Sequence, residues 1–482
     1  MSYEYDMIVI GGGAAGLTAS GMAAVFGAKT ALIEAKKLGG DCTWHGCVPS
    51  KSLLHAAKVA HEMRTADRYG LTPSLAEHDF SRVMAHVHSI RGRIYQDADA
   101  PPHFEKLGVE VIEGRARFVD SHTLEVASSG SIRRFSSRFF VVATGSSPKA
   151  PPMAGIERAN ILTNESIFEL KYRPRHLLVL GAGPMGMELG QAFHRLGSEV
   201  TVVNRSPGIL RRDDPQLSAM LLEHLQGEGI QFAFGTEVTS IEGGTVHLKN
   251  GQRIESDAIL AAAGRKPNID SLNLAAAGVK TNDKGIVVDA RCRSSARHIY
   301  ACGDVAGRYL FTHFAEHMAK TAVTNAILHV PAKMDERHIT WTTFTDPELA
   351  HVGQGEDALK RAGVNYSVYR FPFTQLDRAI TESKTTGLVK VFANKWGRIF
   401  GVSILGAQAG EMIGEYALAM RSGVRLDKIS STIHPYPTYV LGNRRAADLY
   451  MMAKLTPGMV RWFRWLFRLR GDTRGVTALR QA

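Results

Sequence analysis

Two cysteines, Cys42 and Cys47, lie five positions apart in the segment LGGDCTWHGCVPSK, within a chain of 482 residues that contains only four cysteines. The apolar spacing that follows predicts a helix with Pro49 in its first turn, which places Cys47 at a helix N-terminus. The positive end of a helix dipole stabilises a thiolate, and a nearby lysine such as Lys51 adds to this effect. Two thiols without a second pair nearby do not complete a tetrahedral zinc site, so we expect thiol redox chemistry and no metal site.

The segment before the cysteines has the pattern of a dinucleotide-binding unit. YDMIVIGGGAAGLTASGMAAVFGAKTALIE contains a predicted strand, then Gly11, Gly13 and Gly16, a helix of small residues, and a second strand that ends at Glu34. Glycines let the backbone approach a pyrophosphate at the helix N-terminus, and the carboxylate accepts a ribose hydroxyl. The stretch therefore predicts a Rossmann-like unit that binds a dinucleotide.

The same unit occurs again further along the chain. RHLLVLGAGPMGMELGQAFHRLGSEVTVVNR repeats the strand, the glycines Gly181, Gly183 and Gly186, the helix and the second strand. The chain thus contains an internal duplication of a dinucleotide site. A cysteine pair beside one such site, with a second site downstream, suits an electron relay from nicotinamide to flavin to disulfide to substrate.

The two copies differ at the residue that should contact the ribose. Glu34 lies eighteen residues after the third glycine of the first copy, and the equivalent residue of the second copy is Asn204, followed by Arg205. A carboxylate would repel a 2′-phosphate, whereas a neutral Asn204 with Arg205, Arg211 and Arg212 nearby could receive one. This pattern favours NADPH, with NADH as the alternative if the arginines only decorate a solvated turn.

Several further segments give the chain a resemblance to a known family, the class I pyridine nucleotide-disulfide oxidoreductases. This family includes glutathione reductase, dihydrolipoamide dehydrogenase and mercuric reductase. The shared segments, besides the cysteine motif, are VVATGSSPKAPP (141–152), AAAGRKPNID (261–270), IYACGDVAG (299–307), FTDPELAHVG (344–353) and IHPYPT (433–438). The resemblance implies FAD at the first site and a nicotinamide cofactor at the second. It places Thr144, Gly145, Gly264, Gly303 and Asp304 among the cofactor-binding residues.

The resemblance also implies an α/β fold with two Rossmann-like dinucleotide-binding domains and a C-terminal α+β dimerisation domain. We expect residues 1–150 to form the first part of the FAD-binding domain and residues 151–275 the NAD(P)-binding domain. Residues 276–344 would complete the FAD-binding or central domain, and residues 345–482 would form the dimerisation domain. The expected assembly is a homodimer in which each active site is built from two subunits.

The family pattern assigns roles to four side chains. Its first cysteine exchanges with substrate and its second contacts the flavin, which gives these roles to Cys42 and Cys47. Its lysine–glutamate pair beside the flavin corresponds to Lys51 and Glu188.

One catalytic element of the family is altered in this chain. Glutathione reductases and dihydrolipoamide dehydrogenases use a histidine, with a glutamate five residues later, to protonate the leaving thiol. Alignment on Pro437 and Thr438 puts Tyr436 at the histidine position and Leu441 at the glutamate position. A phenol titrates near pH 10, against about 6.5 for imidazole, so Tyr436 is a weaker proton donor at neutral pH. His434 is a second candidate, but we expect it to lack an orienting carboxylate.

The altered proton donor favours an electron acceptor whose reduction releases no thiol, so that no leaving group has to be protonated. A soft metal ion, a quinone or another small-molecule or small-protein acceptor fits this condition, and disulfides remain candidates. Mercuric reductases also place a tyrosine at this position, and thiolates bind soft metals. However, no cysteine follows Cys302, so their C-terminal thiol pair has no counterpart in this sequence.

Charge and composition restrict the partners only loosely. The net charge of +12 is compatible with an anionic ligand, a nucleic acid or an anionic membrane. No helix-turn-helix, zinc-finger spacing or basic patch with interleaved aromatics is evident, so we expect no nucleic-acid partner. The N-terminal stretch MSYEYDMIVIGGG has no pattern of a secretory signal, which predicts a cytoplasmic location.

The C-terminal segment 458–470 is basic and aromatic. Helical spacing gathers Arg461, Arg464 and Arg468 into a stripe and leaves Trp462, Phe463, Trp465, Leu466 and Phe467 over the remaining circumference. Such a helix either packs its apolar face on the dimerisation domain or lies peripherally at the inner face of the membrane. Two other functional interpretations stay open: a membrane-associated flavoprotein that reduces a quinone or a membrane protein, and a non-catalytic flavin-binding redox sensor.

Overall fold

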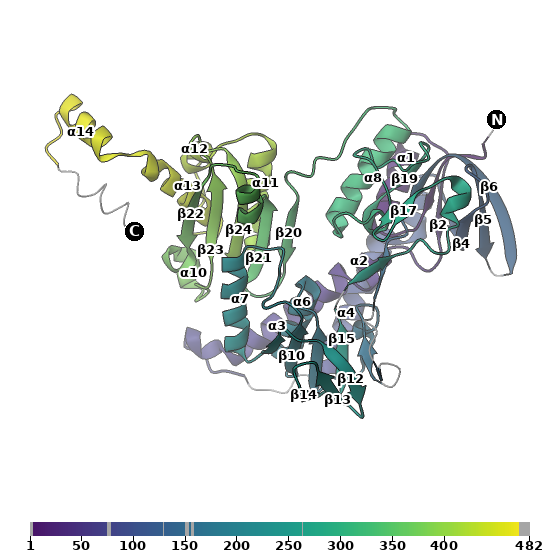
Figure 1. The fold of residues 1–482 in the computed structure, drawn as a ribbon, viewed down its shortest axis with the longest axis horizontal. Coiled ribbons are helices and arrows are strands. Elements are labelled where there is room, and N and C mark those ends of the chain that lie inside the picture. Colours follow the sequence, from purple (N-terminus) through teal and green to yellow (C-terminus); the bar gives the residue numbers. More distant parts are fainter. Residues whose placement is uncertain are drawn as a thin grey trace.

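The computed structural model describes residues 3–74, 79–128, 130–149, 154–155, 159–262 and 264–471. Three large sheets organise these residues, and each lies in a different region of the molecule (Figure 1). This arrangement confirms the expected α/β class with two Rossmann-like units and a separate C-terminal region.

The first sheet has seven strands in the order β3-β2-β1-β6-β5-β4, and β19 pairs with β6 beyond the part that contacts β5. Parallel pairing joins β1 to β2 and β6, which buries these strands on both faces and explains the apolar run YDMIVI of β1. Helices α1 and α8 pack together through small buried side chains such as Ala19 and Ala319. The bounds are β1 Tyr5–Ile10, α1 Ala14–Val25, β2 Thr30–Glu34, β3 Val109–Glu113, β4 Arg115–Phe118, β5 Thr123–Ser128, β6 Ser131–Val142, β19 Ile299–Ala301 and α8 Thr312–Ala326.

The second sheet repeats the parallel design in the order β11-β10-β9-β15-β8. A small antiparallel sheet of β12 (Val238–Glu242), β13 (Thr245–Leu248) and β14 (Arg253–Glu255) adjoins it. The bounds of the main elements are β8 Ile161–Leu162, β9 His176–Leu180, α6 Pro184–Arg195, β10 Glu199–Asn204, α7 Pro215–Glu228, β11 Gln231–Phe234 and β15 Ala258–Ala261.

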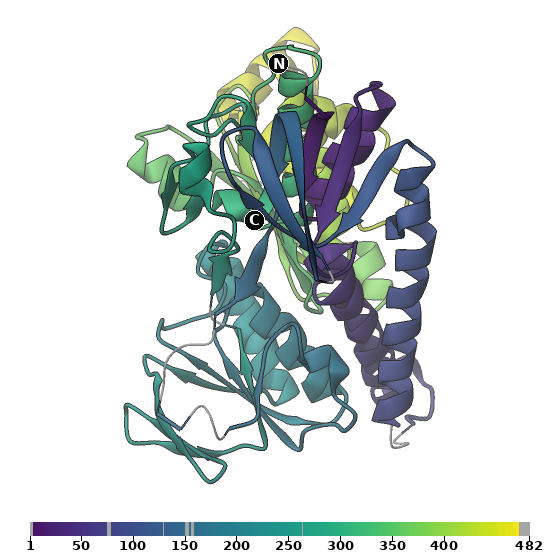
Figure 2. The same cartoon turned by 90° about the vertical axis from the view of Figure 1, so that its right-hand side faces the viewer.

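Two features join the first and second regions. The short strands β7 (Ser146–Pro148) and β16 (Arg265–Pro267) pair antiparallel where the chain passes between the regions. Helix α3 (Cys47–Arg64) packs against both α4 (Phe80–Ile94) and α6, and Figure 2 shows α3 and α4 running side by side. The helix that starts at Cys47 therefore connects the two nucleotide-binding units.

The third sheet is antiparallel in the order β20-β21-β24-β23-β22. Its first strand, β20, begins at Thr340, so the sheet starts slightly before the domain boundary expected at residue 345. The bounds are β20 Thr340–Thr343, β21 Glu348–Gly353, α9 Glu356–Arg361, β22 Ser367–Pro372, α10 Asp377–Thr381, β23 Leu388–Ala393, β24 Ile399–Gly406, α11 Ala409–Arg421, α12 Leu426–Ser431 and α13 Leu441–Lys454.

The last described helix, α14 (Pro457–Leu466), projects away from the third sheet (Figure 1). None of its residues is buried, so among the described residues up to 471 the apolar face does not pack on the dimerisation domain of its own chain in the expected way. The helix ends before Arg468, which has a φ of 50°, so this residue does not continue the expected arginine stripe.

Candidate active site

The two glycine turns have nearly the same geometry. The N–H groups of Gly11 and Gly181 each donate to the main chain of the neighbouring parallel strand, at 2.8 and 2.9 Å. Their φ angles are 101° and 108°, a region that favours glycine. A Cβ on Gly16 would lie 1.7 Å from the oxygen of Gly11, and one on Gly186 would lie 2.1 Å from that of Gly181. The third glycine of each copy therefore permits close contact between the helix and the turn.

A cavity of about 1480 Å³ extends past both turns and both cysteines. Three expected site residues, Gly16, Gly181 and Gly186, support the turns without lining the cavity, and Arg205, His434 and Tyr436 do not line it either. The expected residues that do line it are Gly11, Gly13, Glu34, Cys42, Cys47, Lys51, Thr144, Gly145, Gly183, Glu188, Asn204, Gly264, Gly303 and Asp304.

The first turn has the groups that FAD requires. Gly13 precedes α1 without a side-chain cap, and no acidic residue lies in the first helical turn, so N–H donors remain available for a pyrophosphate. Beside this turn, Glu34 accepts the N–H of Gly12 at 2.6 Å. Two polar atoms of cavity-lining residues, His45 Nδ1 and Asn164 Oδ1, are buried without a partner among the described residues. Buried polar atoms of this kind need partners, so the residues present fit a large polar cofactor.

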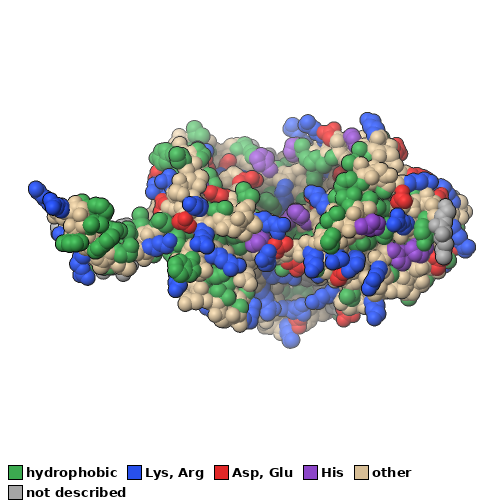
Figure 3. All heavy atoms as spheres, turned by 90° about the horizontal axis from the view of Figure 1, so that it is seen from above, with side chains coloured by type: hydrophobic (Ala, Val, Ile, Leu, Met, Phe, Trp, Pro, Cys, Tyr) green, Lys and Arg blue, Asp and Glu red, His purple; other side chains and the backbone are tan. Residues whose placement is uncertain are grey.

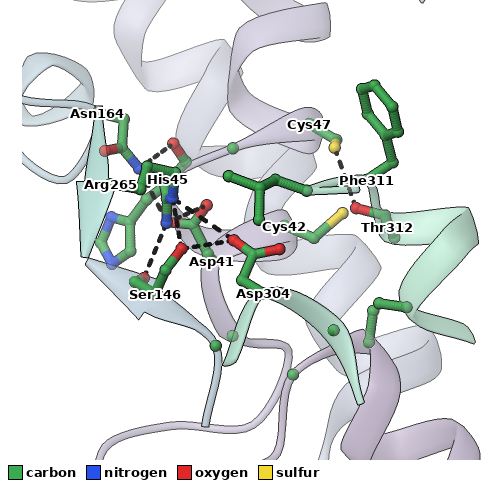
Figure 4. Close-up of a pocket in the computed structure, with 18 of the residues that line it drawn as sticks. Asp41, Cys42, His45, Cys47, Ser146, Asn164, Arg265, Asp304, Phe311 and Thr312 are labelled. Carbon is green, nitrogen blue, oxygen red and sulfur yellow. Dashed lines mark hydrogen bonds and ion pairs between the residues drawn. The ribbon is translucent and has the colours of Figure 1, made fainter. Parts of the chain in front are cut away.

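A polar cluster closes the cavity beside β7 and β16 (Figure 4). Arg265 lies 3.5 Å from Asp304 and 3.2 Å from Asp41, the hydroxyl of Ser146 donates to Asp304, and Asn164 donates to Asp41 at 2.8 Å. Burial raises the pKa of Asp304. These contacts hold the crossover strands against the segment that carries the first cysteine.

The cysteines lie where two helices begin. Cys42 lies in the short helix α2 (Gly40–Trp44), and Cys47 is the first residue of α3. The Sγ atom of Cys47 is 3.4 Å from Oγ1 of Thr312, the first residue of α8 (Figure 4). Both cysteines are free thiols in this structure, so the expected disulfide stays a prediction.

The surroundings shift the pKa values of the two cysteine thiols in opposite directions. A hydrogen bond with Cys42 lowers the pKa of Cys47 to about 6, and Thr312 and Lys51 act in the same direction against the effect of burial. The same hydrogen bond, together with burial, raises the pKa of Cys42. The site is therefore arranged for a thiolate at Cys47 and a protonated thiol at Cys42.

An ion pair with one buried partner lies one helical turn beyond Cys47. The Nζ atom of Lys51 is 2.8 Å from Glu188 on α6, whose side chain is only 6% exposed. The other carboxylate oxygen of Glu188 accepts the N–H of Phe344 at 2.9 Å. Lys51 therefore connects the cysteine helix to the second nucleotide-binding unit, next to the cavity.

The second turn differs from the first in its polar groups. Asn204 ends β10 just as Glu34 ends β2, but its amide donates to the oxygen of Gly208 at 2.8 Å. Arg211 and Arg212 line the cavity, as expected for groups that could approach a phosphate. Arg205 is exposed and does not line the cavity, so the structure does not bring it to this site.

Tyr436 lies in the third region, away from the cysteines of its own chain. Its side chain is 69% exposed, and a hydrogen bond with Asp377 raises its pKa. A raised pKa makes the phenol an even weaker acid at neutral pH. The position is compatible with an active site that two subunits share, because the side chain is accessible from outside the chain.

The expectation that His434 lacks an orienting carboxylate is wrong. Nε2 of His434 lies 2.8 Å from Glu415 on α11, and Nδ1 lies 3.0 Å from the oxygen of Thr432. Asn443 donates to the other oxygen of Glu415 at 2.8 Å. The carboxylate comes from a neighbouring helix and not from a position shortly after the histidine, so local spacing did not reveal it. Both ring nitrogens face acceptors, and the side chain is only 5% exposed.

Sequence reasoning missed several residues that shape the site. Arg265 follows Gly264 directly in the segment AAAGRKPNID, so its charge and its place in this segment are signals in the sequence itself. Thr312 and Glu415 gave no such indication, because their contacts join segments far apart in the sequence.

Comparison with protein-family models gives two matches. Residues 5–323 match the pyridine nucleotide-disulphide oxidoreductase model, and residues 339–444 match the dimerisation domain of pyridine nucleotide-disulphide oxidoreductases.

Similar curated proteins extend over most of the chain. A mercuric reductase from Lysinibacillus sphaericus is 36% identical over 457 residues, which cover 92% of this chain and 82% of that protein. A dihydrolipoyl dehydrogenase from Thermus scotoductus is 35% identical over 458 residues, which cover 92% of this chain and 97% of that protein.

Solved structures show the same similarity. The copper(II) complex of RclA, an HOCl-induced flavoprotein disulfide reductase from Escherichia coli, has a TM-score of 0.84 and 26% identity, with coverage of 93% of this chain and 100% of RclA. LpdA from Mycobacterium tuberculosis has a TM-score of 0.85 and 26% identity, with coverage of 92% and 99%.

Proposed function

The chain belongs to the pyridine nucleotide-disulphide oxidoreductase family, and from that premise we propose that it carries electrons from NADPH to a soft metal ion through a Cys42–Cys47 disulfide. Members of this family depend on FAD and NAD(P)H, and the dimerisation domain indicates a homodimer. The observation that carries the proposal is the position of Cys42 and Cys47, which line the same cavity as both glycine turns, with Cys47 at the start of α3 and 3.4 Å from Oγ1 of Thr312.

Each side chain has a role that follows from its position. FAD, when bound, supplies a two-electron carrier between the nicotinamide and the disulfide. Reduction breaks the S–S bond, and the electron pair and one proton leave a thiolate on Cys47 and a thiol on Cys42. Thr312 and Lys51 hold the negative charge at Cys47. Lys51 is kept in place by Glu188.

A soft metal ion is a suitable acceptor because the third region offers no good proton donor at the two positions expected from the sequence. Tyr436 is a weak acid there, and His434 is engaged at both ring nitrogens, so neither is well arranged to protonate a leaving thiol. A divalent soft metal such as Hg(II) needs no such proton, because it accepts two electrons while Cys42 and Cys47 return to the disulfide. The relatives named mercuric reductase support this class of acceptor, and the copper(II) complex of RclA shows that a similar flavoprotein disulfide reductase binds a metal ion.

A turnover panel with the FAD-loaded enzyme and NADPH tests the acceptor class. Hg(II), Cu(II), lipoamide, glutathione disulfide and a soluble quinone would be compared in the wild type and in Cys42→Ser. We expect the highest kcat/KM with a soft metal ion, and a loss of at least about a hundredfold in Cys42→Ser. Faster turnover with lipoamide or glutathione disulfide than with either metal would refute the metal assignment. Unchanged metal turnover in Cys42→Ser would refute the relay.

The preference for NADPH follows from the second turn. Asn204 carries no charge to repel a 2′-phosphate, and Arg211 and Arg212 line the same cavity. We expect Arg211→Gln/Arg212→Gln to raise KM for NADPH by roughly tenfold or more while KM for NADH changes little. Arg205→Gln is the matched control, because Arg205 is exposed outside the cavity. Equal kcat/KM for NADH and NADPH in the wild type would contradict the preference.

A further inference from the structure

The C-terminal helix α14 is specified by local signals and not by packing. The side chain of Thr456 accepts the N–H of Met459 at 3.0 Å, and Pro457 occupies the first helical position. None of the ten residues of the helix is buried. A helix of this length gains little stability by itself in water, so an apolar face with no buried residue indicates that another surface covers it.

The most exposed apolar side chains of this segment are aromatic. Trp462 is 54% exposed, Trp465 is 76% exposed and Phe467, just beyond the helix, is 63% exposed. Figure 3 shows this segment projecting from the body of the molecule with hydrophobic and basic side chains together on its surface. Tryptophan is suited to the boundary between water and lipid, because its ring is largely apolar and its N–H is a donor.

Charge identifies the kind of surface that fits. Residues 449–470 contain five lysines and arginines and no aspartate or glutamate. Within α14, helical spacing places Arg461 and Arg464 on one side, and the apolar residues occupy much of the rest of the circumference: Trp462, Phe463, Trp465 and Leu466. Two copies of this segment packed together would bring like charges into contact, whereas anionic headgroups would neutralise them.

We propose that α14 docks the protein on an anionic phospholipid bilayer, with Trp462 and Trp465 in the interface and Arg461 and Arg464 at the headgroups. No helix among the described residues is long and apolar enough to cross a membrane. In the proposed docking the helix lies parallel to the surface and binds reversibly, as other interfacial amphipathic helices do. The proposal stands independently of the electron acceptor.

Vesicle sedimentation with the full-length holoenzyme tests the docking. Vesicles of phosphatidylcholine alone would be compared with vesicles that contain about one-third phosphatidylglycerol. We expect binding at least about tenfold tighter to the anionic vesicles. Arg461→Gln/Arg464→Gln should weaken this binding by roughly 25-fold, because each cation near the surface contributes roughly fivefold. Trp462→Ser/Trp465→Ser should abolish it, while NADPH oxidation in solution is unchanged.

Trp396→Ser is the matched control, because Trp396 is 64% exposed beside the basic residue Lys395 in the third region. It should bind vesicles like the wild type. Equal binding to neutral and anionic vesicles, or full binding by Trp462→Ser/Trp465→Ser, would overturn the proposal. If Trp462→Ser/Trp465→Ser dissociated the dimer without changing vesicle binding, α14 would instead pack against the partner subunit.

Discussion

At the scale of single residues, the site depends on how negative charge is placed on one of two neighbouring sulfurs. Cys47 begins α3, and Thr312 begins α8, so two helix N-termini meet at the same sulfur. Helix dipoles and hydrogen-bond donors stabilise a thiolate in such a position. The role of Cys47 at a helix start could be expected from the sequence, because Pro49 and the apolar spacing are local features. The contribution of Thr312 could not, because it depends on the packing of α8 beside α3.

The charge on Cys47 predicts a pH dependence of the reduced, FAD-loaded enzyme. A thiolate in contact with oxidised flavin absorbs at long wavelength, so this absorption should be present above pH 6 and disappear as the pH falls through about 6. Thr312→Val removes a hydrogen bond that lowers the pKa, so the midpoint should move to higher pH. Anaerobic absorbance titrations of both proteins provide the measurement. A wild-type midpoint near 9 would show that the surroundings do not stabilise the thiolate.

At the scale of elements, the two βαβ units were predictable because all their determinants are local. Strand, glycine turn, helix and final residue follow one another within about thirty residues in each copy. The carboxylate that contacts His434 was not predictable, because Glu415 belongs to α11 and reaches the histidine only in the folded third region. The projection of α14 from the third region was also not predictable. An amphipathic pattern indicates that the apolar face of a helix is buried against another surface, but it does not identify that surface.

Alanine substitution should destabilise the protein at Gly16, in the glycine turn of the first unit, but not at Gly92. A Cβ at position 16 would meet the oxygen of Gly11 at 1.7 Å, so Gly16→Ala should lower the free energy of unfolding by about 3 kcal/mol and reduce FAD content. Gly92, near the end of α4, has nothing within 4 Å of its ideal Cβ, so Gly92→Ala should be neutral or stabilising by up to about 1 kcal/mol. Urea unfolding and flavin absorbance of the purified proteins measure both. Full FAD content and normal stability in Gly16→Ala would contradict the close contact.

At the scale of the whole molecule, ion pairs hold the second region against the third. Lys390 of β23 lies 2.8 Å from Asp214, and both side chains are almost fully buried. Asp214 also caps α7 by accepting the N–H groups of Gln216 and Leu217. The pair therefore couples the position of a helix in the nucleotide-binding unit to the C-terminal sheet. The order of the domains along the chain could be expected from the resemblance to the family. The contact between Lys390 and Asp214 could not, because it depends on how the second and third regions pack.

Removal of one partner should leave a buried charge without compensation. Lys390→Met should lower the free energy of unfolding by about 3 kcal/mol, seen as a lower urea midpoint at fixed protein concentration. Adding Asp214→Asn should restore much of this loss, because the asparagine can still cap α7 without a charge. Lys395→Met is the control on the same hairpin, since Lys395 is exposed, and its effect should stay within about 0.5 kcal/mol. Equal effects of Lys390→Met and Lys395→Met would show that the ion pair between Lys390 and Asp214 does not hold the two regions together.

The most direct test of the electron relay is an anaerobic NADPH titration of the FAD-loaded enzyme, followed by maleimide labelling and peptide mass spectrometry. Before NADPH, we expect the peptide that contains Cys42 and Cys47 to be unlabelled and lighter by two hydrogens, as a disulfide requires. After one equivalent, both Cys42 and Cys47 should become open to labelling as the long-wavelength absorption appears, because reduction opens the S–S bond. Labelling of both cysteines before NADPH, or reduction of FAD without any change in the reactivity of Cys42, would contradict the relay.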